Sequence, residues 1–87
     1  MQHISGVTVI FEYIEWDEAN LDHATRRATD IDIEQVIWNA REFQRHRQQP
    51  GRVMFRAATN GGRMLTVVAA YDEVRNVIRP ITAWEEK

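Results

Sequence analysis

A nearly continuous apolar run, MLTVVAAY from Met64 to Tyr71, constrains the fold of this chain more than any other stretch. A strand with one solvated face alternates apolar and polar residues, whereas a continuous apolar run is typical of a strand buried on both faces. The sequence Asn60-Gly61-Gly62 just before the run is a strong signal for a β-hairpin. We therefore expect Met64–Tyr71 to be the central strand of a sheet.

The residues on both sides of this run predict two further strands. In RVMFRA, residues 52–57, apolar residues alternate with two arginines and a methionine, which is the period of a strand. After a turn at residues 72–76, the segment VIRPITAW from Val77 to Trp84 predicts the last strand. Pro80 lacks the backbone N–H that a ladder requires, so this strand is expected to be an edge there or to carry a bulge.

A basic strand is predicted upstream of residue 52. Phe43, Arg45 and Arg47 would share one face of this strand, and His46 would lie on the opposite face. The turn sequence QQPG would join it to the next strand, so that the arginines of the two strands form one patch around the turn.

The first 40 residues predict one strand and two helices. The segment Val7–Ile14 is rich in β-branched and aromatic residues and predicts a strand. Asp17 is suited to cap a first helix, and Trp16 can pack against Leu21 one turn later. The second helix has apolar residues at the spacing of a buried face. These residues are Ile33, Val36, Ile37 and Ala40.

The predicted elements follow the order β-α-α-β-β-β-β, which indicates an α+β domain with two helices packed on a curved antiparallel sheet. The 87 residues suit a single domain that spans 1–87. The lack of cysteine excludes a disulfide scaffold and cysteine-based zinc or nucleophile sites. No apolar run approaches the roughly 18 residues of a membrane span, and the first residues do not resemble a signal peptide. We expect a soluble, cytoplasmic protein that does not contact membranes.

Charge is unevenly distributed along the chain, although the net charge is only −2. Residues 1–40 hold eight carboxylates and two arginines, whereas residues 41–79 hold eight arginines and three carboxylates. Arginine carries a planar guanidinium group that matches phosphate oxygens. The asymmetry therefore indicates that the second half binds a polyanion. A charged outer sheet face with cross-strand Arg–Glu pairs explains the same pattern without a ligand.

Sequence motifs narrow the possible chemistry. The motifs of serine hydrolases, nucleotide-binding loops and zinc proteases are absent, and no histidine has partners at metal-ligand spacing, so we expect no cofactor and no metal. His46 lies among arginines, whose charge favours the neutral imidazole that a general base needs. More commonly, a histidine at such a position faces solvent and has no catalytic role.

RNA cleavage is a reaction that an arginine patch can support without a metal. A base takes the 2′ proton, cations stabilise the charge on the phosphorane, and an acid protonates the leaving 5′ oxygen. Arginines can supply the second of these functions. The candidates for catalysis are His46, Arg52 and Arg79, and the candidates for RNA binding are Arg45, Arg47, Arg56 and Arg63.

Several short motifs follow one another in a characteristic order. They are Trp16-Asp17, the helix at residues 33–40, the strand at residues 65–68, and Ile78-Arg79 followed by Ile81-Thr82-Ala83. This order resembles that of BrnT-type toxins, small bacterial ribonucleases of type II toxin–antitoxin pairs with a RelE-like fold. The resemblance covers almost the whole chain and implies a growth-inhibiting ribonuclease. By position it transfers only Arg79 as a site residue, whereas the hairpin arginines match in kind.

Two positions depart from the pattern of that family. Members often carry Lys-His-Gly between the helices, where this chain has Arg27-Ala28-Thr29. Many also end the last motif in Ala-Arg, whereas Ala83 is followed here by Trp84. The missing histidine favours an alternative interpretation, in which the chain is a non-catalytic RelE-like module that binds an antitoxin or nucleic acid.

The resemblance also implies a partner. An antitoxin with a DNA-binding domain would cover the toxin, and the complex would bind operator DNA to repress its own operon. The acidic helices and the arginine face are the two candidate surfaces for that antitoxin. A small structural partner without a nucleic-acid role, which the net negative charge favours, is the third interpretation.

Overall fold

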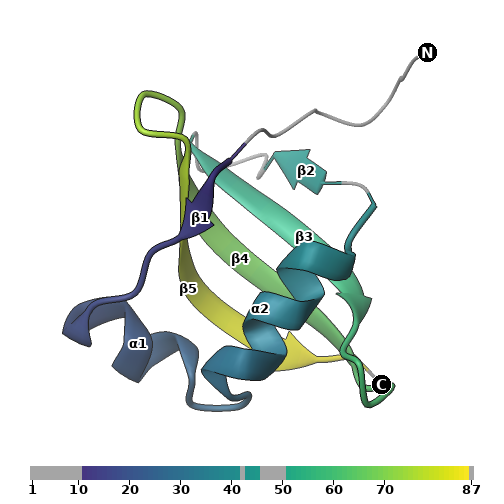
Figure 1. The fold of residues 1–87 in the computed structure, drawn as a ribbon. Helices are drawn as coiled ribbons and strands as arrows, with labels where there is room; N and C mark the ends of the chain where they lie inside the picture. The colour runs from purple at the N-terminus through teal and green to yellow at the C-terminus, as the bar shows by residue number, and fades with distance from the viewer. Residues whose placement is uncertain (1–10, 42, 46–50, 87) are drawn as a thin grey trace.

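The structure, a computed structural model, describes residues 11–41, 43–45 and 51–86 and shows two helices beside a five-stranded sheet (Figure 1). In chain order the elements are β1 (Tyr13–Ile14), α1 (Glu18–Ala24), α2 (Asp30–Asn39), β2 (Phe43–Arg45), β3 (Arg52–Ala58), β4 (Met64–Asp72) and β5 (Val77–Glu85). The predicted element order is therefore confirmed. Residues 7–10 of the first predicted strand lie outside the described residues.

The sheet is mixed, with the strand order β1-β5-β4-β3-β2. Strands β2 to β5 pair antiparallel with their neighbours, whereas β1 pairs parallel with β5. The prediction of a wholly antiparallel sheet is therefore wrong at this edge. The physical reason is the path of the chain, which leaves β1 through both helices before it enters β2 at the opposite edge. A strand that returns through helices is free to run parallel to its neighbour.

The hydrophobic core lies between the two helices and one face of the sheet, since both helices cover the same face in Figure 1. Strand β4 is central, and its residues 65–69 are buried, as the apolar run predicts. Helix α2 contributes Ile33, Val36 and Ile37, all buried as predicted, and it packs against β3 and β4. The predicted central strand and the predicted buried helix face are both confirmed.

Helix α1 begins at a capping box. The Asp17 carboxylate accepts a hydrogen bond from the Asn20 N–H, and the Asn20 side chain accepts one from the Asp17 N–H. Asp17 is therefore the helix cap, as predicted. Leu21 stays 39% exposed, and Trp16 packs against the core while its indole donates a hydrogen bond to Glu34 at 2.7 Å. Trp16 thus links the entry of α1 to α2.

A bulge in β5 decides which residues of this strand share a face. Val68 pairs with Thr82, but the next residue of β4, Ala69, pairs with Pro80, so Ile81 is the extra residue. This confirms the predicted irregularity at Pro80. Because side chains alternate between faces, one extra residue reverses the alternation beyond it. Trp84 therefore shares a face with Arg79, although five positions separate them.

We call the face of the sheet opposite the helices the open face. Residues that pair directly across antiparallel strands share a face, so the register defines the members of this face. By this register the open face carries Gln44 of β2, Arg52, Met54, Arg56 and Ala58 of β3, Met64, Thr66, Val68, Ala70 and Asp72 of β4, and Val77, Arg79, Thr82 and Trp84 of β5.

Candidate functional site on the open face

Three of the predicted site arginines lie on the open face. Arg52 pairs with Ala70, which pairs with Arg79, so these two arginines belong to one row across β3, β4 and β5. Arg56 begins a second row, in which Thr66 and Trp84 follow. The register therefore brings Arg52, Arg56 and Arg79 onto one face, which the alternation of RVMFRA predicts for the first two.

Arg45 does not join them. It pairs with Val53, and its position in the register therefore belongs to the face that carries Val53 and Phe55, not to the open face. The prediction of one patch that includes Arg45 with Arg52 and Arg56 is wrong. The physical reason is that Phe43 pairs with Phe55 in the core, and residues two apart in a strand share a face. His46 and Arg47 lie outside the described residues.

Arg63 lies at the end of the hairpin on the helix side. Its guanidinium donates to Asp32 of α2 at 3.2 Å and to Glu85 of β5 at 3.3 Å. This double ion pair ties the β3–β4 turn to α2 and β5. Arg63, a candidate for RNA binding from the sequence, is thus directed away from the open face and Arg56.

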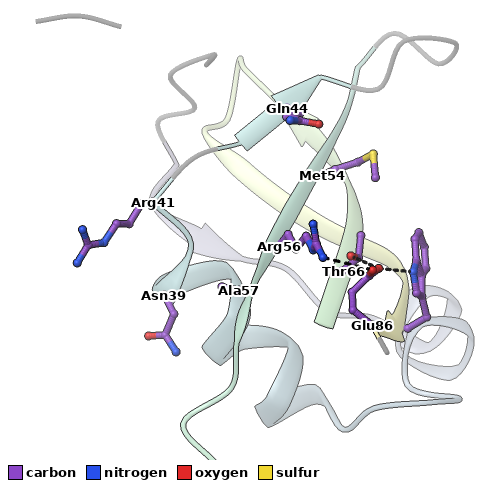
Figure 2. A pocket seen from close by; sticks show the side chains of 9 residues that line it. Asn39, Arg41, Gln44, Met54, Arg56, Ala57, Thr66 and Glu86 are labelled. Atoms are coloured by element: carbon purple, nitrogen blue, oxygen red, sulfur yellow. Dashed lines mark hydrogen bonds and ion pairs between the residues drawn. The ribbon is translucent and has the colours of Figure 1, made fainter. Parts of the chain in front are cut away.

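A pocket of about 630 Å³ has lining residues on the open face near β3 and at the end of α2, and Figure 2 shows their side chains. Its lining combines polar and charged side chains with Met54 and the Trp84 side chain. The lining residues are Asn39, Arg41, Gln44, Met54, Arg56, Ala57, Thr66, Trp84 and Glu86. A hollow of this size can hold a nucleotide-sized group.

Glu86 is the fixed acidic group of this pocket. Its Oε2 accepts hydrogen bonds from the Thr66 hydroxyl at 2.6 Å and from the Trp84 indole at 2.8 Å (Figure 2). Its Oε1 lies 3.6 Å from Nη2 of Arg56. The hydrogen bond from Thr66, aided by the Trp84 indole and the charge of Arg56, holds the pKa of Glu86 below its ordinary value of 4.5 against the opposing effect of burial. The pocket therefore contains a carboxylate beside an arginine that is 67% exposed.

This pair was not identified from the sequence, since Glu86 belongs to no recognised motif and lies beyond the last predicted strand. A usable signal exists in the sequence. Trp84 and Glu86 are two residues apart, so a strand that continues beyond Trp84 places both on one face. With a bulge next to Pro80, that face is the face of Arg56 and Thr66.

A network of ion pairs holds Arg79 at the β5 edge. Its Nη1 donates to Glu15 and its Nη2 to Asp17, both at 2.8 Å. Arg75 donates to both oxygens of Glu15, at 3.0 and 3.1 Å, and to Asp72 at 2.8 Å. Arg79 thus links the end of β1 and the cap of α1 to β5. Its guanidinium already has two carboxylate partners, which makes it less accessible to phosphate than Arg56.

We expect this network to make the fold sensitive to acid. Hydrogen bonds from Arg75 and then Arg79 lower the pKa of Glu15 from its ordinary 4.5, and a hydrogen bond from Arg79 lowers the pKa of Asp17 from 3.8. Because both pKa values are lower in the folded state, the network stabilises fully above the unfolded values. That stability is lost as the pH falls through 4.5 and 3.8 toward the folded values. Solvent screening keeps the effect modest.

Urea unfolding between neutral pH and pH 3.8 measures this loss. An Arg79→Gln variant should be less stable than the wild type at neutral pH, and its unfolding midpoint should change less on acidification. Parallel midpoint curves for the two proteins would show that the network does not set the acid sensitivity.

Within residues 11–41, 43–45 and 51–86, no group of three or more histidine, cysteine or acidic residues is arranged to hold a metal ion. Among the helices of the described chain, none has the length and apolarity needed to cross a membrane.

The fold and the pocket define a small α+β domain with a mixed five-stranded sheet and an Arg–Glu pair on its open face. Comparison with models of protein families, with curated proteins and with solved structures gave no significant match to this chain. The resemblance to BrnT-type toxins therefore stays a prediction.

Proposed function

We propose that the protein is a BrnT-like ribonuclease, the toxin of a type II toxin–antitoxin pair, and that it cleaves RNA in the open-face pocket without a metal. The observation that carries the proposal is the position of Arg56. Its guanidinium is largely exposed in a pocket of about 630 Å³ and lies 3.6 Å from a fixed carboxylate. A cation and a proton-accepting group side by side are two of the requirements for attack by a 2′-hydroxyl.

Within this proposal the open-face arginines have different roles. Arg56 contacts the scissile phosphate, because it faces the pocket and its ion pair with Glu86 is loose, at 3.6 Å. Arg52 belongs to the same face and extends the positive charge along β3. Arg79 holds β1 and α1 in place, since both of its terminal nitrogens bind carboxylates. The arginines proposed to contact RNA, Arg52 and Arg56, therefore both lie on β3 and not on β5.

Replacement of Arg56 tests the proposal. Incubated with single-stranded RNA, the purified wild-type protein should cleave it in the presence of EDTA, and Arg56→Ala should lower the rate by about 10²-fold, the usual effect of a lost transition-state donor. Arg26→Ala is the matched control, because Arg26 is exposed beside Asp22 on the helix side and its removal should leave the rate unchanged. RNA that stays intact with the wild type, or equal rates for wild type and Arg56→Ala, would contradict the proposal.

The partner belongs to the same proposal. Induced expression should stop bacterial growth with loss of RNA, and co-expression of an antitoxin encoded by the adjacent gene should restore growth. This antitoxin would carry the DNA-binding domain through which the complex binds operator DNA. Cytoplasmic localisation follows from an RNA substrate.

A non-catalytic binding module is the second candidate, and the ion pairs favour it. Arg63, Arg75 and Arg79 each have two carboxylate partners, which is the pattern of a charged surface that stabilises itself. This candidate predicts salt-dependent RNA or antitoxin binding without any cleavage product. The cleavage assay with the wild-type protein separates the two candidates directly.

A further inference from the structure

The two oxygens of the Glu86 carboxylate have unequal environments. Oε2 accepts both hydrogen bonds, from the Thr66 hydroxyl and the Trp84 indole, and these fix the orientation of the group. Oε1 accepts no hydrogen bond from the side chains that the structure describes, and the nearby charge is that of Arg56 at 3.6 Å. The side chain of Glu86 is 29% exposed. One oxygen is therefore held in place while the other remains able to accept a proton inside the pocket.

We propose that Glu86 is the general base of the reaction and that its Oε1 takes the proton of the substrate's 2′-hydroxyl. This inference rests on the proposed RNA cleavage. As the proton moves to Oε1, the 2′ oxygen bonds to phosphorus and the bond between phosphorus and the 5′ oxygen breaks. The leaving 5′ oxygen takes a proton from solvent, and Glu86 returns its proton to solvent. The products are a 2′,3′-cyclic phosphate and a 5′-hydroxyl.

Arg56 and Glu86 complement each other in this step. The guanidinium of Arg56 stabilises the charge that develops on the phosphate oxygens, and its distance from Oε1 places a bound phosphate next to the base. A glutamate carboxylate is ionised at neutral pH, so the form that accepts the proton is the resting form. The pocket therefore requires no histidine at this position.

Glu86 also has a structural contact that the experiment must keep apart from catalysis. The Glu86 backbone N–H donates to the Met64 carbonyl at 2.8 Å, and the side chain connects β4 with the end of β5. A glutamine retains an oxygen that can accept from Thr66 and Trp84, but it is not a base at neutral pH. Glu86→Gln thus removes proton transfer with little change in packing.

The matched control is Glu85→Gln, which makes the same chemical change one residue away. Glu85 belongs to the helix-side face and pairs with Arg63, outside the pocket. Both variants should retain the circular dichroism spectrum of the wild type. Binding of an RNA with a single 2′-deoxy substitution at the cleavage site, which cannot react, shows whether the pocket still accepts the substrate.

We expect Glu86→Gln to lower the single-turnover cleavage rate by about 10²-fold or more, the usual contribution of a general base. Its binding of the unreactive RNA should be unchanged or tighter, because a negative charge is removed. Glu85→Gln should cleave at the wild-type rate. In Glu86→Ala, added formate should restore the rate in proportion to its concentration, which a purely structural residue would not show.

The outcomes separate this inference from the proposed function. If the wild type releases cyclic phosphate ends while Glu86→Gln cleaves equally fast, Glu86 is not the base and the ribonuclease proposal stands. A slow Glu86→Gln whose Glu86→Ala counterpart gains nothing from formate also overturns the inference, since the loss is then structural. If the wild type leaves RNA intact, the proposed function fails and the inference fails with it.

Discussion

The Phe55→Ala variant is expected to lose about 3–5 kcal/mol of unfolding free energy, the usual cost of replacing a buried phenylalanine by alanine. Phe55 is fully buried on β3, and its ring meets that of Phe43 edge-on at 4.7 Å and that of Phe11 at 6.4 Å. It pairs with Val67 on the central strand. The cavity left by the substitution would remove the contacts through which Phe43 of β2 and Phe11 pack against the core.

This loss is large relative to the whole stability of such a domain, since folded proteins are stable by only about 5–15 kcal/mol. Chemical unfolding followed by circular dichroism should therefore show a greatly lowered midpoint or a partly unfolded population in buffer. Val74→Ala is the control, because Val74 is 92% exposed and its change should stay within about 0.5 kcal/mol. A Phe55→Ala protein as stable as Val74→Ala would contradict the described packing of the core.

The elements that the sequence predicted well are those whose evidence is local. The continuous apolar run at Met64–Tyr71 and the alternation in residues 52–57 report burial directly, because each side chain must match the face on which it lies. In helix α2 the apolar residues Ile33, Val36 and Ile37 also report burial directly, with a period of 3.6 residues. The parallel pairing of β1 with β5 has no local signature. It depends on contacts between Tyr13–Ile14 and Val77–Ile78, far apart in the chain.

The sequence placed only some residues of the candidate pocket, again because it reveals local alternation but not the pairing of distant strands. Alternation alone put Arg56 on the open face, opposite the buried Phe55. Glu86 reaches the same pocket only because the bulge at Ile81 reverses the alternation in β5. Pro80 predicted an irregularity in the last strand. Which residue becomes the extra residue of the bulge depends on how β4 and β5 pair, and the local sequence does not show this pairing. Arg63 was a candidate from the sequence but does not lie on the open face. Its ion pairs with Asp32 of α2 and Glu85 of β5 depend on the tertiary fold, so the local sequence does not reveal them.

The Asn20→Asp variant is expected to be destabilised by at least about 2 kcal/mol, because a buried amide that donates two hydrogen bonds would become a carboxylate facing two carbonyl oxygens. Asn20 is 8% exposed in α1. Its side-chain nitrogen donates to the Glu15 carbonyl at 3.0 Å and to the Pro80 carbonyl at 3.1 Å. This one side chain thus fastens the start of α1 to the bulged part of β5.

The bulge determines which residues of β5 lie on the open face. Loss of the Asn20 hydrogen bond to Pro80 should therefore also disturb the pocket. Unfolding by urea should show the loss of stability, and tryptophan fluorescence should report whether Trp84 and Trp16 change their surroundings before global unfolding. Asn39→Asp is the matched control, since the Asn39 amide also donates two hydrogen bonds, to the Ala58 carbonyl and to the Asn60 side chain, but is exposed at the end of α2, where water can replace them. Equal losses in the two variants would mean that the buried bond to Pro80 contributes nothing specific to the position of β5.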